Sequence, residues 1–431
     1  MHPRPILPGL SPGLFLNSLL LLAFLTLPAR AEEVTQAGHP YALGVILPDS
    51  PEADRDKALT DFYTQWKSLY LTEGCGKDRA YVNVGADGKA MQGGAAEDTI
   101  TVSEAHGYGM LITVLMADKD PKAHALFDDM VRFFRDHPAA SGPGLMAWNQ
   151  VLGCDDASGR VNGATTASDG DLDIAMALLL ADKTWGSKGA ISYKTEAKTV
   201  LAAILAREVA AEDRYMLLGD WAKAPDPENP DRAITTRTSD FMPGHFTAFA
   251  RTTGETRWYD LRDQSYALLE QLRHRWARDT GLVPDFIIAR LEGPEPAARN
   301  VLEGEGDGAF SWNAARVPWR IAMDAVLYGN QRARAALLPM IAWIRKDTGD
   351  DPSQINAGYW LSGAPMADQG EDQMAFLAPM AVAAMVDPDH QKWLDALWKD
   401  ITKRSLADED YYGNTLKLLC MIVLTGHWPP L

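Results

Sequence analysis

Two short segments place carboxylates beside glycines where a polar loop meets an apolar helix. The first, residues 102–110, reads Val-Ser-Glu-Ala-His-Gly-Tyr-Gly-Met, and the second, residues 167–175, reads Ala-Ser-Asp-Gly-Asp-Leu-Asp-Ile-Ala. Carboxylates packed together raise one another's pKa, which produces an acid that stays protonated near neutral pH. Ser103 and Asp169 are also natural helix N-caps, and acidic residues suit a helix N-terminus. Capping does not require three aspartates in five residues, but from these residues alone both interpretations stay open.

Aromatic side chains are the second group with a chemical use, because flat aromatic rings are typical of sugar-binding clefts as well as of cores. Five of them lie at predicted junctions of loop and helix, where they would line a cleft: Tyr108, Trp148, Trp221, Trp312 and Trp319. Three others lie on helical faces and are predicted to pack in the interior: Trp343, Trp393 and Trp398. Arg316 and Arg320 either orient loop carboxylates or form structural ion pairs.

The helices that must position these residues come in pairs from about residue 54 onward. In each pair the first helix is apolar all round and the second has one apolar face: 109–116 with 123–135, 174–181 with 193–205, 246–252 with 258–273, 320–328 with 332–344, and 374–386 with 390–401. A helix that is apolar all round is buried, whereas one with a single apolar stripe lies at the surface. With a helix at 54–71 and the C-terminal segment, the pairs predict an all-α (α/α)6 barrel, an inner ring wrapped by an outer ring. A helical solenoid, the alternative, would repeat regularly every ~34–47 residues.

Long acidic, glycine-rich loops precede the predicted inner helices, at 85–102, 153–169, 220–240 and 293–313. Long loops gathered at one end of a rigid scaffold commonly carry function. We therefore expect the functional site at that end of the barrel.

Composition limits the classes of partner. The chain has 431 residues, with 41 Lys and Arg against 58 Asp and Glu, for a net charge of −17. This balance argues against nucleic acid and against an anionic membrane surface, since both require a basic face. The sequence contains no His-Glu-x-x-His or Cys/His metal motif and no strand-linked Gly-x-Gly-x-x-Gly, so we expect neither a metal nor a nucleotide cofactor. A Ca²⁺ site at 169–173 would lack the downstream glutamate of an EF-hand loop.

Residues 1–31 are typical of a secretory signal peptide. His2 and Arg4 precede an apolar run at 14–27 that is too short to span a bilayer comfortably, and Ala29-Arg30-Ala31 is a small-residue cleavage site. We predict cleavage after about Ala31, a single catalytic domain at 32–431, and a secreted or periplasmic protein without stable membrane association. That compartment permits disulfides. Cys75 and Cys154, both in glycine-rich loops, are candidates for one, and Cys420 is expected to be a buried thiol.

The two acidic segments resemble the signature segments of glycoside hydrolase family 8, inverting enzymes that cut β-1,4-linked glucan, chitosan or xylan. The stretch 167–185 is similar to the family's Asp-rich motif, and Ser-Glu-x-x-Gly-Tyr-Gly-Met at 103–110 to the segment with the proton donor. Further similar segments are 219–221, 236–240 and 313–320, so the resemblance extends over nearly the whole mature chain. It implies an (α/α)6 barrel, with Glu104 as proton donor and Asp169 at the subsite of the reacting sugar. As substrate-binding residues we expect the aromatics Tyr108, Trp148, Trp221 and Trp312, with Asp171, Arg237, Asp240 and Arg316.

One position departs from the family's cellulase branch, whose general base is an Asp just before Arg-x-Pro-Trp-Arg. Here that position is Asn313, which cannot accept a proton. A second branch, which contains chitosanases and some β-glucanases, takes its base from a longer loop upstream, and this chain has such a loop at 301–307. The resemblance therefore places the base at Glu303, with Glu305 as the fallback. The alternative is that both are solvated loop acids.

The expected activity is inverting, endo-acting hydrolysis of chitosan, of β-glucan, or of both. An inverting enzyme holds its two carboxyls about 6.5–9.5 Å apart, and we expect Glu104 and Glu303 at that spacing with Asp169 between them. The acidic charge gives chitosan a slight lead. The alternatives are an endoglucanase that assists bacterial cellulose export, which normally uses the Asp base missing at Asn313, and a glycan-binding protein that has lost its base. We expect a monomer whose only partner is the polysaccharide.

Overall fold

Six helices are buried over most of their length, as predicted for an inner ring. The computed structural model describes residues 39–89, 95–157, 163–211, 215–224, 226–367 and 373–431. These helices are α2 (Ser103–Leu115), α4 (Ser168–Trp185), α6 (Pro243–Thr253), α8 (Val317–Tyr328), α10 (Met374–Ala384) and α12 (Tyr411–Leu424). They are rich in Ala, Leu, Met and Gly, which suits a helix with neighbours on every side.

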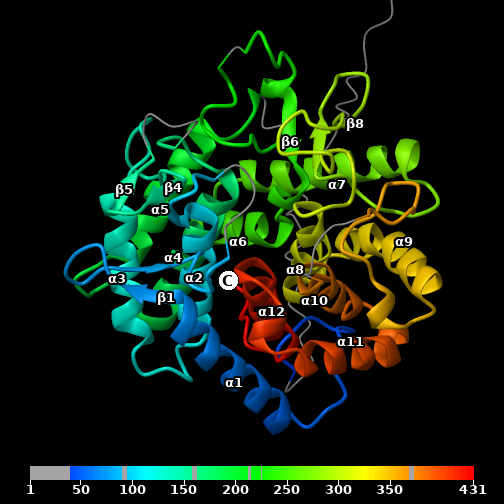
Figure 1. Cartoon of the computed structure of the whole chain (residues 1–431), viewed down its shortest axis with the longest axis horizontal. Helices are drawn as coiled ribbons and strands as arrows, with labels where there is room; N and C mark the ends of the chain where they lie inside the picture. Colours follow the sequence, from blue (N-terminus) through cyan, green and yellow to red (C-terminus); the bar gives the residue numbers. More distant parts are fainter. Residues whose placement is uncertain (1–38, 90–94, 158–162, 212–214, 225, 368–372) are drawn as a thin grey trace, which may run out of the picture. The chain divides into compact units, whose positions relative to one another are not determined.

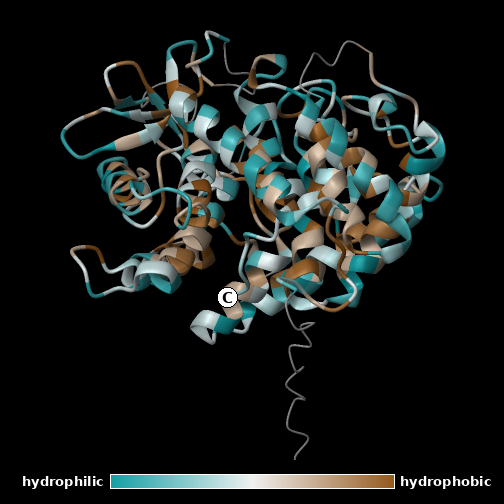
Figure 2. Cartoon of the chain, turned by 90° about the horizontal axis from the view of Figure 1, so that it is seen from below, coloured by the Kyte–Doolittle hydropathy of each residue, from teal (hydrophilic) through white to brown (hydrophobic). Residues whose placement is uncertain are grey.

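Six further helices pack against the outside of the inner helices and keep an exposed polar face. They are α1 (Glu52–Tyr70), α3 (Ala123–Asp136), α5 (Tyr193–Arg207), α7 (Arg257–Trp276), α9 (Gln331–Thr348) and α11 (Gln391–Lys403). Hydrophobic and hydrophilic residues alternate along such helices in Figure 2. The outer helices α3, α5, α7, α9 and α11 follow their inner partners along the chain, whereas α1 packs against α12.

The inner helices form a closed ring. Each contacts the next along the chain, and α12 contacts α2, so segments from opposite ends of the described chain lie side by side (Figure 1). A solenoid would leave its first and last repeats apart. The all-α (α/α)6 barrel predicted from the periodicity is therefore confirmed.

Short antiparallel strands, which the periodicity did not predict, organise the loops before the inner helices. β3 (Thr99–Val102) pairs with β4 (Asn149–Val151), which pairs with β5 (Asp155–Asp156). A second small sheet joins β6 (Thr235–Arg237), β7 (Phe286–Ile288) and β8 (Glu295–Pro296). Runs of two to four residues are too short to show a period of two, which is why sequence pattern alone misses them. β3 leads directly into α2, and β6 ends at Arg237, so both sheets position site residues.

A disulfide joins two further loops. Cys75, between β1 (Leu71–Glu73) and β2 (Ala80–Val82), is bonded to Cys154, between β4 and β5, with 5.5 Å between the Cα atoms. The predicted pairing is therefore confirmed. Cys420 is a buried free thiol, also as predicted.

The predicted signal peptide lies outside the described residues, all of which belong to one compact unit. Among them, no helix combines the length and apolar character needed to cross a bilayer.

Candidate active site

The first turns of α2 and α4 lie unusually close together because glycines occupy their contact. A Cβ on Gly107 would lie 2.9 Å from Asp173 Cβ, and one on Gly170 would lie 2.5 Å from Ser103 Oγ. Real Cβ atoms essentially never approach so closely. The glycines in these two segments therefore allow the backbones to meet, and Glu104 and Asp169 share a hydrogen bond across the contact.

Helix capping does not explain the acidic residues at these helix starts. The N-cap positions are Val102 and Ala167, and neither uses a side chain as a cap. Ser103 and Asp169 instead lie in the first turn, where Asp169 Oδ1 accepts a hydrogen bond from the Gly170 N–H at 2.9 Å. The N-cap interpretation of Ser103 and Asp169 is thus wrong.

Arg316, just before α8, binds both carboxylates. Its Nη1 donates to Glu104 Oε2, to Asp169 Oδ2 at 3.0 Å and to the Tyr108 hydroxyl at 3.2 Å. Its Nη2 donates to Asn313 Oδ1 at 2.6 Å. Arg316 is 2% exposed. One buried guanidinium therefore connects the starts of α2 and α4 to the segment before α8.

Glu104 is the carboxyl of this pair whose pKa is raised. Burial raises the pKa of Glu104 to about 7, against the opposing charge of Arg316 and with a further contribution from Asp169. The sequence analysis considered packed carboxylates as the cause of a raised pKa, but burial contributes more than Asp169. A carboxylic acid with a pKa near the working pH is suited to general acid catalysis.

Asp169 stays ionised beside it. Burial raises the pKa of Asp169, but Arg237 and Arg316 outweigh burial and bring it down to about 2. Arg237 Nη1 lies 3.3 Å from Asp169 Oδ2. The two carboxyls are therefore driven apart in pKa, which is how one site obtains an acid and an anion at the same pH.

Glu303 reaches the same group from the loop at 301–307. Its Oε1 lies 3.3 Å from Arg237 Nη2, and its Oε2 accepts a hydrogen bond from Asn313 Nδ2 at 2.8 Å. The buried Asp307 carboxylate shapes the loop by accepting the N–H groups of three successive residues, 302 to 304, at 2.7–3.1 Å. Glu305 is exposed, and none of the hydrogen bonds or ion pairs that the structure describes at the site involves it.

Three residues predicted to bind substrate lie beneath the surface. Tyr108, Asp171 and Asp240 have no exposed area, so in this structure they support the site rather than face a ligand. Burial and the charge of Glu208 raise the pKa of Asp171 well above its usual range, and burial raises that of Glu208 to about 8. The two buried carboxyls therefore influence each other's pKa beneath the site.

The aromatic residues predicted to line a cleft differ in how exposed they are. Trp148, Trp221 and Trp312 are half-buried and remain available to a ligand. Trp319 has no exposed area, and the centroid of its ring lies 4.0 Å from the guanidinium carbon of Arg320. The prediction that Trp319 lines a cleft is therefore wrong. Trp393 and Trp398 are buried in the core as predicted, and Trp343 packs partly buried against the core.

The structure adds residues that the sequence analysis missed. Asp285, directly before β7, accepts the N–H groups of Ser311 at 3.0 Å and Ala314 at 2.7 Å, and burial raises its pKa to about 8. Tyr412, at the start of α12, donates its hydroxyl proton to the Trp312 carbonyl at 2.7 Å. The position of Tyr412 at the start of an inner helix could have indicated that it lies near the site. Nothing in the sequence distinguishes Asp285 from the other acidic residues in loops.

Other polar groups belong to the scaffold. Asp173 is buried between Arg320, with Nη1 at 2.8 Å, and His245, with Nε2 at 2.9 Å. Arg320 thus forms a structural ion pair, and Arg316 orients carboxylates. Among the residues that the structure describes, no group of three or more His, Cys, Asp or Glu side chains is placed to hold a metal ion.

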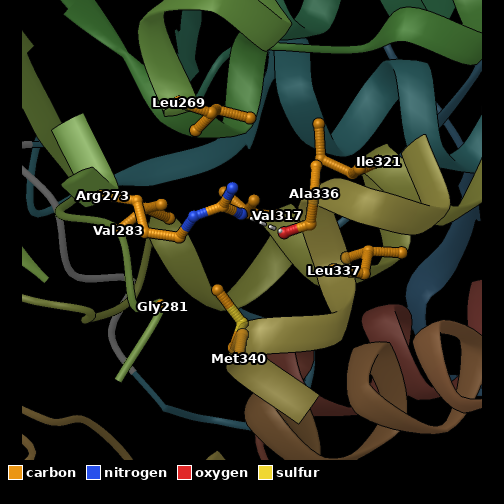
Figure 3. Close-up of a pocket in the computed structure, with 9 residues that line it drawn as sticks. All are labelled: Leu269, Arg273, Gly281, Val283, Val317, Ile321, Ala336, Leu337 and Met340. Atoms are coloured by element: carbon orange, nitrogen blue, oxygen red, sulfur yellow. Dashed lines mark hydrogen bonds between the residues drawn. The ribbon is translucent and has the colours of Figure 1, made fainter. Parts of the chain in front are cut away.

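An apolar hollow lies elsewhere, between α7, α8 and α9 (Figure 3). Its lining includes Leu269, Ile321, Leu337 and Met340, and Arg273 donates to the Ala336 carbonyl at 3.1 Å. The lining contains no carboxylate that could act as acid or base. The chemistry therefore resides in the carboxylate–arginine group at the starts of the inner helices.

Comparison with known proteins identifies the family of the chain. The model of glycosyl hydrolases family 8 matches residues 50–426. The chain belongs to this family. It is 38% identical to the β-glucanase of Niallia circulans, over 94% of this chain and 95% of that protein. It is 30% identical to endoglucanase A of Acetivibrio thermocellus, over 97% of this chain and 80% of that protein.

Solved structures agree with the family assignment. The apo structure of the β-1,3-1,4-glucanase from Paenibacillus sp. X4 superposes with a TM-score of 0.82 at 36% identity, covering 91% of this chain and 98% of that one. Rex8A from Paenibacillus barcinonensis, complexed with xylose, has a TM-score of 0.68 at 22% identity and shares the fold. This family 8 chain is therefore a glycoside hydrolase with an (α/α)6 barrel.

Proposed function

We propose that this family 8 enzyme is an inverting, endo-acting hydrolase of β-1,4-linked glucan, with Glu104 as general acid and Glu303 as general base. The observation that carries the proposal is the pairing of a protonated carboxyl, Glu104, with a second carboxylate on a separate loop. Arg316, Asn313 and Arg237 connect the two. Both inverting and retaining glycosidases use two carboxyl groups, and inverting enzymes leave room for a water between them.

In the proposed mechanism Glu104 gives its proton to the glycosidic oxygen as the bond to the anomeric carbon breaks. Glu303 removes a proton from a water that attacks the same carbon from the opposite face. Asn313 donates to one Glu303 oxygen and Arg237 lies beside the other, so the anionic form required of a base has partners on both oxygens. Asp169, ionised beside Glu104, is placed to stabilise positive charge that develops on the sugar ring.

The pH dependence of kcat/KM is expected to reflect this assignment. Glu104 must be protonated to act, and its pKa is about 7. Activity should therefore fall about tenfold for each pH unit above 7. An activity that stays constant well above that pH would contradict the role of Glu104 as acid.

β-Glucan is the substrate that we place first, because two close relatives are called a β-glucanase and a β-1,3-1,4-glucanase. Chitosan is the second candidate. The chain carries a net charge of −17, and an acidic protein suits a polycation. The contacts of Glu303 argue against a glycan-binding protein without a base. The Asn at 313 argues against the role in cellulose export.

We also propose that the enzyme works outside the cytoplasm after removal of residues 1–31. The Cys75–Cys154 disulfide supports this, since disulfides persist in oxidising compartments. N-terminal sequencing of the protein from its native host tests the cleavage site. An N-terminus upstream of the apolar run at 14–27 would overturn the proposal.

The deciding experiment measures release of reducing ends from mixed-linkage glucan, carboxymethyl cellulose and chitosan in parallel, with Glu104→Gln as the inactive control. Proton NMR of the first product, taken before mutarotation, should show the α-anomer. An initial β-anomer would mean retention and would reject the water-activating role of Glu303. Equal release by wild type and Glu104→Gln would reject the acid assignment.

A further inference from the structure

Asn313 hydrogen-bonds to the proposed base, Glu303, and to Arg316, which binds the proposed acid, Glu104. It is 6% exposed, and its amide lies between Arg316, which binds Glu104, and Glu303. The amide oxygen accepts from Arg316 Nη2 at 2.6 Å, and the amide nitrogen donates to Glu303 Oε2 at 2.8 Å. A weaker contact of 3.5 Å joins the same nitrogen to Asp285 Oδ2.

The orientation of this amide follows from its neighbours alone. A guanidinium has only N–H donors, so the atom of Asn313 that faces Arg316 must be the oxygen. The NH₂ group then necessarily faces Glu303 and Asp285, both of which offer carboxyl oxygens. If the amide were rotated by half a turn, its NH₂ group would face the N–H donors of Arg316, and its oxygen would face the carboxylate of Glu303. Neither contact would be a hydrogen bond.

We propose that Asn313 is a positioning residue that fixes Arg316 and Glu303 at the same time, and that a neutral donor is required at this position whenever Glu303 is the base. This inference rests on the proposed function. An aspartate at 313 would still accept from Arg316, but it could not donate to Glu303 and would add a negative charge beside it. The two arrangements of the base, on the loop or at position 313, therefore exclude one another.

The surrounding charges make the effect of a carboxylate predictable. Glu303 faces Arg237 from β6 and Asn313 from the segment before α8, and its own loop is held by Asp307. Asp285 lies behind the amide, and the charge of Glu303 contributes to its raised pKa. Asp240 and Asp169 lie beyond Arg237. A further anion at 313 would meet two carboxyls, and its one cationic partner, Arg316, already binds Glu104 and Asp169.

The test compares Asn313→Asp with Asn313→Ala by kcat/KM across pH. In Asn313→Asp a second carboxylate lies beside the proposed base, so the acidic limb of the profile should move upward by about one pH unit or more. Asn313→Ala removes both hydrogen bonds without adding charge. It should lower kcat about tenfold to a hundredfold. It should move the limb upward by less than Asn313→Asp does, because only the donor is lost. A purely structural role would lower activity by the same factor at every pH in both variants, and that result would overturn the proposal.

Asn330→Asp is the matched control, because Asn330 also donates its amide to a carboxylate, Asp324 Oδ2 at 2.6 Å, at the far end of α8. It should lower Tm and leave the pH profile unchanged. A shifted limb in this control would overturn the inference, since any added carboxylate would then produce the effect.

Two further variants separate the possible failures. Glu303→Gln should be nearly inactive. If this variant keeps its activity, the assignment of Glu303 as the base is rejected, whatever the Asn313 variants show. If Glu303→Gln is inactive and Asn313→Asp has a wild-type profile, only the role of Asn313 is overturned. Should Asn313→Asp unfold, the double variant Asn313→Asp/Glu303→Gln decides. It reverses donor and acceptor, so it should regain Tm, and failure to do so would refute the hydrogen-bond assignment.

Discussion

Replacing Gly170 by alanine should push α2 away from α4 at the point where Glu104 is held. The new Cβ would lie 2.6 Å from the Ser103 carbonyl carbon and 2.8 Å from the Glu104 nitrogen, whereas ordinary contact begins at 3.4 Å. Ser103 Oγ would lie nearer still, at 2.5 Å, but the other two obstructing atoms are backbone, so rotation of the Ser103 side chain alone does not relieve the contact. The start of α2 must therefore move by about 0.6–0.8 Å, and a displacement of about 1 Å at a catalytic group can cost about a hundredfold in rate.

The expected result for Gly170→Ala is a large loss of kcat with a moderate loss of stability. Overpacking costs about 1–3 kcal/mol, and the higher helix propensity of alanine returns up to ~1 kcal/mol of it. Steady-state rates on a soluble β-glucan, with Tm on the same preparations, measure the two effects separately.

Gly109→Ala provides the matched comparison on the same helix. Its Cβ would lie 2.4 Å from Val82 Cγ2 and 2.7 Å from Met130 Cε, which are side-chain atoms away from α4. This variant should lose stability to a similar extent and keep most of its kcat. If Gly170→Ala and Gly109→Ala lose kcat equally, or if Gly170→Ala keeps wild-type kcat, the reasoning about the helix contact is refuted.

Three other predictions concern single groups. Glu104→Gln should fold normally and lower kcat by about 10²–10⁴, because an amide is not a useful acid; circular dichroism and turnover together test this, and near-normal turnover would contradict it. Removing the disulfide by Cys75→Ser/Cys154→Ser should lower the free energy of unfolding by about 2–4 kcal/mol with the site intact, and unchanged stability in a denaturant titration would show that the bond is unimportant. Burial raises the pKa of Glu208 from 4.5 to about 8, so the native state retains a proton that the unfolded chain releases, and stability from this group should decline as the pH rises from about 4.5 to about 8. Glu208→Gln should flatten that part of the Tm–pH curve, and an unchanged slope would argue against the raised pKa.

The fold was largely predictable because helical periodicity is a local property of the chain. Apolar residues on all sides at 174–181, and on one side at 193–205, were enough to separate inner from outer helices. The structure places α5 at Tyr193–Arg207, close to the predicted range, whereas α4 is much longer than predicted, at Ser168–Trp185. The short strands β3 and β6 were not predictable. Two to four residues carry no period, and their pairing depends on segments about 50 residues away.

The candidate site was likewise predictable only in part. By itself the sequence determined which acids begin the inner helices, so Glu104 and Asp169 could be named from their local pattern. The surroundings of each group became known from the three-dimensional arrangement: burial more than Asp169 raises the pKa of Glu104, and Asn313 lies between Arg316 and Glu303. Desolvation and hydrogen bonding depend on atoms brought together from distant parts of the chain, and no local pattern records them.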